Sequence, residues 1–178
     1  MQDSLCPFGP AFRQERIQRN VSQWTLAVRL PYHIRNLQRI EGGLRQPGVM
    51  LALRMVVGLG AAPGDFFQRL LEGDLTRSLC PAEQPPEPVP VMYHPPEVGE
   101  DAKCLFGPLL VQARAAGGVS QTAMAKTAKY NLRNVNAVEK GRQEPGVMSA
   151  LALVGATGVD IREFFNCLSE LSGLHFEE

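Results

Sequence analysis

The amino-acid sequence predicts an all-α protein built from two similar five-helix units with a proline-rich linker between them. When the chain is shifted by 98 positions, residues 6–72 match residues 104–170 at 27 of 67 positions without a gap. Apolar residues recur at helical spacing through both copies. Because this long period occurs only twice, it indicates a duplicated domain and not a solenoid, which needs at least three shorter repeats.

Three short helices are expected first. The first helix is expected over about 10–20, with Pro10 in its first turn, where proline is tolerated. Ser22 is a typical N-cap for a second helix, which Pro31 ends. The third helix is expected over 33–41, and Gly43 closes it.

Two more helices complete the first copy. The fourth begins near Pro47 and ends at 58–60, and the fifth begins near Pro63. Five short helices in each copy predict two compact helical domains. The corresponding helices of the second copy are expected at about 108–117, 120–128, 131–139, 145–156 and 160–171.

The segment 80–101 separates the two copies. It holds seven of the fourteen prolines and five acidic residues, so we expect an extended spacer and not a helix. Its VPVMY stretch (89–93) could instead add a short strand to a partner. We therefore divide the chain into a first domain at 1–73, a linker at 74–103 and a second domain at 104–178.

Charge is distributed unevenly along the chain. The total is neutral, with 18 basic and 18 acidic residues. Residues 8–72 carry nine arginines against four acids, residues 73–105 carry two basic and six acidic residues, and residues 106–178 carry seven of each. Only the first third has the excess of positive charge expected of a polyanion-binding surface.

Several classes of function lack support in the residues. The four cysteines form no CxxC pair and the three histidines are scattered, so we expect no metal site and no cofactor. No nucleophile–histidine–acid set, phosphate-binding glycine loop or paired carboxylates occur, so we do not expect an enzyme. The sequence shows no signal peptide and no membrane-spanning apolar run, which favours a cytoplasmic, nucleoid-associated protein without membrane contact.

A ladder of residues at fixed spacing occurs in both copies. Counted from Ser22 and from Ser120, it places Gln at +1, Leu or Met at +4, Ala at +5, an apolar residue at +15, Glu at +19 and Gly at +21. Crossing helices need a small side chain where they touch, which explains the Ala. With PGVM following at 47–50 and 145–148, each copy resembles the Cro/C1-type (XRE family) helix-turn-helix proteins of phages and bacteria.

The resemblance implies two lambda-repressor-like helix-turn-helix domains joined by the linker. It also implies that the third helix of each domain, 33–41 and 131–139, lies in the major groove of double-stranded DNA. The implied base-reading positions are Ile34, Arg35, Asn36 and Arg39 in the first copy, and Leu132, Arg133, Asn134 and Ala137 in the second. The resemblance implies phosphate contact by Gln23 and Gln121. Two arginines that follow the third helices, Arg45 and Arg142, are further candidates for phosphate contact.

The side-chain chemistry of the third helices agrees with this assignment. Arg can make a bidentate contact with guanine and Asn with adenine, each contributing about 1–3 kcal/mol of base discrimination. The Arg-Asn pair at 35–36 and 133–134 is identical in both copies, although helical spacing places it outward, where packing does not demand it. The alternative is a solvated helix face that has changed little since the duplication.

Two positions depart from the family pattern. The family usually has glycine in a left-handed turn nine residues after the serine. Here that position holds Pro31, which we expect to exclude positive φ, and Lys129, which adopts it at a cost. The second copy also has Ala137 where the first has Arg39. These departures leave room for a different helix crossing, and for a second copy that binds DNA weakly or serves as a partner surface.

Paired phenylalanines lie near the end of each copy, at Phe66–Phe67 and Phe164–Phe165. We expect at least one ring of each pair in the core. The other is a candidate for an interface, either between the two copies or between chains in a homodimer.

The sequence predicts a sequence-specific transcriptional regulator, a repressor in the first instance, whose partner is a double-stranded DNA operator. If the two third helices are related by a two-fold axis, they would meet half-sites about 34 Å apart. Direct repeats and a homodimer presenting four such helices stay open. The alternative function is a protein-interaction module, antiactivator or antitoxin-like, in which one or both units no longer bind DNA.

Overall fold

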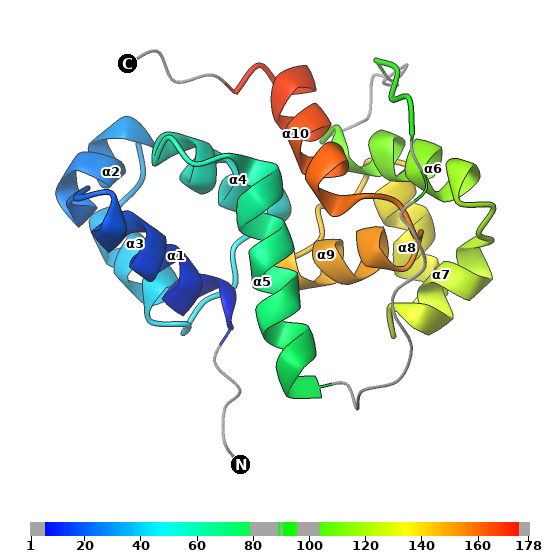
Figure 1. The fold of residues 1–178 in the computed structure, drawn as a ribbon, viewed down its shortest axis with the longest axis horizontal. Coiled ribbons are helices and arrows are strands. Elements are labelled where there is room, and N and C mark those ends of the chain that lie inside the picture. The colour runs from blue at the N-terminus through cyan, green and yellow to red at the C-terminus, as the bar shows by residue number, and fades with distance from the viewer. Residues whose placement is uncertain (1–5, 79–88, 90, 96–103, 175–178) are drawn as a thin grey trace.

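A computed structural model of the chain confirms the all-α class. It describes residues 6–78, 89, 91–95 and 104–174, and within these residues it shows ten helices and only isolated β-bridges (Figure 1). The first half holds α1 (Phe8–Gln18), α2 (Gln23–Arg29), α3 (Ile34–Glu41), α4 (Val49–Gly58) and α5 (Pro63–Ser78). The second half holds α6 (Phe106–Ala116), α7 (Gln121–Thr127), α8 (Leu132–Glu139), α9 (Val147–Gly155) and α10 (Ile161–Leu171).

Capping side chains mark the start of α2, α3, α7, α8 and α10. Ser22 Oγ accepts the backbone N–H of Thr25 at 3.0 Å, and Ser120 has the same role in the second half. The third helix begins one residue later than expected because His33 is itself the N-cap. Its Nδ1 accepts the N–H of Arg35 at 3.2 Å, which satisfies a donor that the helix leaves unpaired.

The turn between the second and third helices is left-handed in both halves. The φ angle is +26° at Pro31 and +49° at Lys129. The expectation that Pro31 excludes positive φ is therefore wrong. The reason lies in the helix end, where the N–H of Tyr32 donates to the carbonyl of Ala27 at 2.9 Å and an equivalent bond closes α7. A bond of this kind turns the chain back over the helix and requires a left-handed residue just before it.

A glycine lets the first helix of each half cross the third at close range. A Cβ on Gly9 would collide with the carbonyl oxygen of Ile40, and a Cβ on Gly107 would collide with that of Val138. The surrounding core is rich in phenylalanine, with Phe8 fully buried among other rings. This close approach explains why FGP occurs in both copies.

The two halves meet through equivalent backbone groups. The N–H of Val49 donates to the carbonyl of Pro145, and the N–H of Val147 donates to the carbonyl of Pro47, both at 3.0 Å. These two bonds flank an antiparallel bridge between Gly48 and Gly146. Gly48 thus faces its own counterpart 98 positions away, and the two flanking bonds are equivalent when the copies are exchanged, which is the signature of a two-fold, isologous contact.

Helices α5 and α10 pack against each other beside this bridge, in the middle of the molecule (Figure 1). The rings of Phe67 and Phe165 approach to 4.2 Å between centroids, and they too are counterparts. All four paired phenylalanines are buried, none more than 3% exposed. Of the two alternatives for these rings, the structure therefore shows contact between the copies. A homodimer stays a prediction.

Part of the expected linker is described and belongs to the fold. Helix α5 continues to Ser78, beyond the boundary expected at 73. The N–H of Val89, the first residue of the VPVMY stretch, donates to the carbonyl of Gly158 at 3.0 Å in an isolated bridge within the same chain. Farther along, the ring of Tyr93 packs edge-on against Phe164. The rest of the predicted spacer lies outside the described residues.

Candidate nucleic-acid interface

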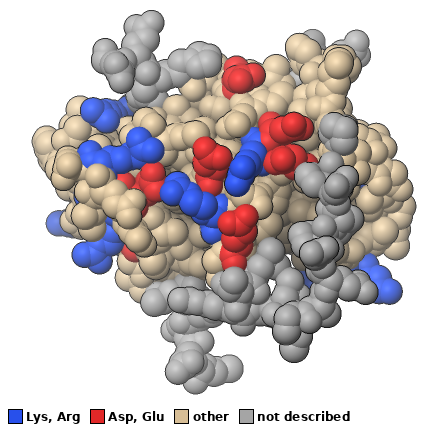
Figure 2. Space-filling model, viewed as in Figure 1, with Lys and Arg blue, Asp and Glu red and all other residues tan. Residues whose placement is uncertain are grey.

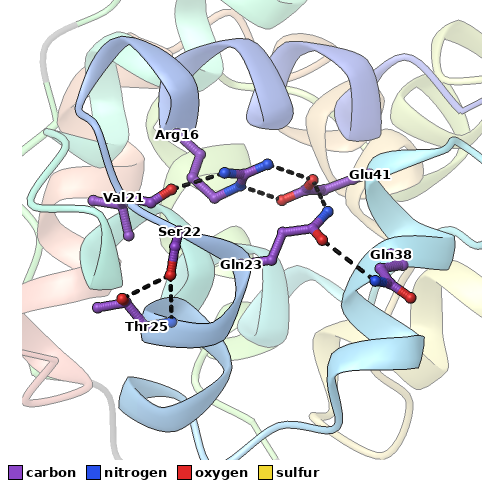
Figure 3. A network of polar contacts seen from close by, with 7 residues as sticks. All are labelled: Arg16, Val21, Ser22, Gln23, Thr25, Gln38 and Glu41. Carbon is purple, nitrogen blue, oxygen red and sulfur yellow. Dashed lines mark hydrogen bonds and ion pairs between the residues drawn. The ribbon is translucent and has the colours of Figure 1, made fainter.

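A buried ion pair fixes the orientation of α3 against α1 and α2 (Figure 3). Glu41, at the end of α3, is 3% exposed and accepts from Arg16 Nε at 2.6 Å and from Arg16 Nη2 at 2.9 Å. Arg16 Nη1 also donates to the carbonyl of Val21 at 2.7 Å, just before α2. The Arg16 guanidinium therefore links α1 to the end of α3 and to the start of α2, and the position of the outer face of α3 depends on these bonds.

The second half contains the same network. Arg114 Nε donates to Glu139 at 2.6 Å, and Arg114 Nη1 donates to the carbonyl of Val119 at 3.0 Å. Sequence reasoning assigned these arginines and glutamates no role beyond the spacing of the Glu. A signal was available, because Arg16 and Glu41 are both identical in the second copy at the same separation of 25 residues.

The two glutamines expected to contact phosphate take part in these networks. Gln23 Nε2 donates to Glu41 at 2.7 Å, and Gln121 Nε2 donates to Glu139 at 2.5 Å. Both side chains are half-buried. A glutamine amide has two hydrogens, so one remains in each for a phosphate oxygen. In the first half, Gln38 Nε2 also approaches Gln23 Oε1 at 3.4 Å, which links the outer face of α3 to the start of α2.

Exposed arginines line the outer side of α3. Arg35 and Arg39 are four residues apart, so they share one helix face, and Arg45 follows in the next loop. All three are exposed, and within the described residues none of their guanidinium groups has a protein partner. No acidic residue stands in the first turn of α3. Ile34 and Asn36 are half-buried beside them.

Helix α8 presents fewer basic side chains on the corresponding face. Arg133 and Arg142 are exposed, and their guanidinium groups also lack a partner among the described residues. Leu132 is 45% exposed, and Asn134 and Ala137 are half-buried. On the face drawn in Figure 2, most of the basic side chains lie over the half that holds α1 to α4, mixed with acids toward the centre. This face is therefore more basic over the first half, in agreement with the sequence counts.

The first half also exposes four large apolar side chains. Ile17 is 54% exposed, Trp24 68%, Val28 63% and Leu44 70%. Their counterparts in the second copy are Ala115, Thr122, Lys126 and Arg142. Trp24 and Val28 lie four residues apart on one face of α2, and Ile17 borders an open hollow of about 440 Å³ between α1 and the end of α3. Comparison of the two copies could have found this difference from the sequence.

Comparisons with known proteins give no relative: no family model, no curated protein and no solved structure matches this chain. Among the described helices, none is by itself long and apolar enough to cross a bilayer. Assignment of a function therefore rests on the chemistry of the outer faces of α3 and α8.

Proposed function

We propose that the chain is a sequence-specific regulator of transcription that binds a double-stranded DNA operator through two Cro/C1-type helix-turn-helix domains. One observation carries this proposal. Arg35 and Arg133 are identical counterparts in the first turn of helices held by the same buried network. Both guanidinium groups are exposed and have no partner in the part of the chain that the structure describes. A free guanidinium at this end of a third helix suits bidentate contact with guanine in a major groove.

The other groups divide into base-reading and positioning roles. Arg39 lies on the same face as Arg35 and would reach a neighbouring base. Arg45, Arg142 and the free amide hydrogens of the two glutamines would bind phosphates, which fixes register without reading sequence. Repression is the simplest output of such binding, because a protein seated on a promoter excludes polymerase by occupancy alone.

The proposal is tested by a gel-shift titration against operator DNA selected from a random pool. Affinity is expected to fall steeply between 50 and 200 mM salt as phosphate counterions are released, by the orders of magnitude typical of multiple phosphate contacts. Arg35→Ala combined with Arg133→Ala is expected to lower the ratio of operator to random DNA binding by about 1–3 kcal/mol per lost base contact.

Arg54→Ala is the matched control, since Arg54 is an exposed arginine that belongs to α4 and to neither third helix. It is expected to weaken binding to operator and to random DNA equally, or to change neither. An unchanged specificity ratio in the Arg35/Arg133 variant would refute the assignment of α3 and α8 as reading helices.

A second candidate function is a protein-interaction module of the antiactivator or antitoxin-like kind. The exposed apolar set on the first half favours it, because Trp24 and Val28 have the polar counterparts Thr122 and Lys126. Large exposed apolar side chains grouped on one helix face often mark a protein contact. Under this function, Trp24→Thr with Val28→Lys abolishes capture of a protein partner, whereas Arg35→Ala does not, and selection from a random pool enriches no DNA sequence.

A further inference from the structure

The contact between the two halves has the symmetry of a dimer interface, which bears on the number of chains that bind one operator. It joins counterpart residues reciprocally, through Val49 with Pro145 and Val147 with Pro47. It also buries the counterpart rings of Phe67 and Phe165 against each other. Two symmetric subunits of a dimer meet in the same way, but here both copies lie in one chain. A two-fold axis through this contact, extended over both halves, would relate α3 to α8 as it relates the reading helices of two subunits.

The two reading faces related by this axis are not equal. They share the Arg-Asn pairs at 35–36 and 133–134. They differ where α3 has Arg39 and α8 has Ala137, and where α3 has Gln38 and α8 has Asn136. In a homodimer, symmetry makes both half-sites equal in sequence. A duplicated chain is free of that constraint, since each face can change alone.

We propose that a single chain occupies a complete operator, and that this operator is an inverted repeat with unequal half-sites. The half-sites share the bases opposite the Arg-Asn pairs and differ at the base opposite Arg39 and Ala137. Their centres lie about one helical turn apart, at about 34 Å. This inference rests on the proposed function, and it adds the operator's form, its polarity and the stoichiometry of one chain per site.

Covalent linkage supports one chain per operator. Once one reading helix is bound, the other is presented at the effective concentration of an intramolecular partner, which is millimolar for short links and higher for packed units. Binding is therefore expected to show a 1:1 stoichiometry and a Hill coefficient of one at every protein concentration. A chain that dimerises to bind would give a steeper isotherm near its dimer dissociation constant.

The test begins with selection of double-stranded DNA from a random pool by the full chain, followed by native mass spectrometry of the complex. The expected product is an inverted repeat with one half-site that has an additional base preference. Arg39→Ala is then expected to reduce that preference about ten-fold at one position in one half-site, leaving the other half-site unchanged. Arg39 suits this test because its side chain is exposed and its guanidinium has no partner within the described residues.

Ala137→Arg is the reciprocal change and is expected to create a matching preference in the second half-site. Thermal melting of both variants checks that they fold, and Arg39→Ala decides alone if Ala137→Arg does not fold. Enrichment of a direct repeat or a single half-site, two chains per site, or a change in both half-sites with Arg39→Ala would overturn this inference while leaving DNA binding intact. Enrichment of no sequence would overturn the proposed function itself.

Discussion

At the scale of single residues, Glu41 is expected to contribute strongly to stability. Its carboxylate accepts two hydrogen bonds from Arg16 and one from Gln23, and it is 3% exposed. Glu41→Gln leaves the buried Arg16 without its counter-charge, which costs about 3 kcal/mol in a pair of this kind. The midpoint of urea unfolding, compared with that of the wild type at equal slope, measures the loss.

Two controls separate the buried charge from simple loss of packing. Arg16→Met combined with Glu41→Leu removes both charges and is expected to recover most of the loss. Arg162→Ala breaks an exposed pair with Asp65, whose atoms are 3.6 Å apart, and is expected to change stability by less than about 1 kcal/mol. If Glu41→Gln costs no more than Arg162→Ala, the network does not hold α3 in place.

Tyr93 provides a second prediction at this scale. Its hydroxyl is buried and has no hydrogen-bond partner among the described residues. Burial raises the pKa of Tyr93, and the nearby charges of Cys167 and Glu163 raise it further. An unpaired buried hydroxyl costs about 1–3 kcal/mol, so Tyr93→Phe is expected to raise the thermal midpoint. Its edge-on contact with Phe164 does not need the hydroxyl.

The pH dependence of this effect has a definite sign. A raised pKa in the folded state stabilises the protein below the unfolded pKa of about 10, and that stability is lost as pH rises toward the folded pKa. The wild type therefore loses stability above pH 10 through this group, and Tyr93→Phe does not. Thermal melts at pH 7 and pH 11 should show a wider gap at pH 11, and a narrower gap there would contradict the assignment.

At the scale of helices and turns, local signals predicted the boundaries well. Ser22 as N-cap, Gly43 after the third helix and Pro63 at the start of the fifth all act through the backbone of their own segment, so their effect can be read from neighbouring residues. Sequence reasoning failed at Pro31, where the hydrogen bond that closes α2 outweighs the preference of the residue itself.

The site could be predicted only in part for a related reason. The outward direction of Arg35 and Arg133 follows from helical spacing, and the structure confirms their exposure. The engagement of Gln23 and Gln121 with buried glutamates depends on how three helices meet, which no local pattern reports. The contact of α5 with α10 was one of two alternatives for the paired phenylalanines, and the sequence could not choose between them because an apolar helix face can pack against many partners.

The strained turns give a prediction at this scale. Lys129→Gly removes the clash of a side chain with positive φ, which is expected to outweigh the entropy cost of glycine and stabilise the protein by about 0.5–1 kcal/mol. Pro31→Gly should stabilise more, because the proline ring holds φ near −65°. Lys126→Gly, the same change inside α7, is the control and should cost about 1 kcal/mol. Thermal melting measures the stability of all three variants. If Lys126→Gly and Lys129→Gly change stability in the same direction, the turn at Lys129 is not strained.

At the scale of the whole molecule, the rigid pairing of the two halves depends on close contact of α5 with α10. Gly64 lies at this contact, and its N–H donates to the side-chain oxygen of Asn166 at 2.9 Å. A Cβ at Gly64 would lie 2.5–2.9 Å from three backbone atoms of Arg162. Backbone atoms cannot rotate away as a side chain can, so α5 would have to move from α10.

Gly64→Ala is therefore expected to destabilise the protein by about 1–3 kcal/mol, the usual cost of forcing an added methyl into a packed contact. Gly73→Ala is the matched control on the same helix, since a Cβ placed there would meet, among the described residues, nothing within 4 Å outside its own helix backbone and chain neighbours. This control should stabilise by about 0.5–1 kcal/mol through helix propensity. Thermal melting measures both variants, and small-angle scattering should show a larger radius of gyration for Gly64→Ala alone.

Because the proposed operator needs both reading helices at one fixed spacing, Gly64→Ala should also weaken binding to the full inverted repeat more than binding to an isolated half-site. Equal stability of Gly64→Ala and Gly73→Ala would show that the two halves are not held by this contact, and the single-chain operator would then lose its structural basis.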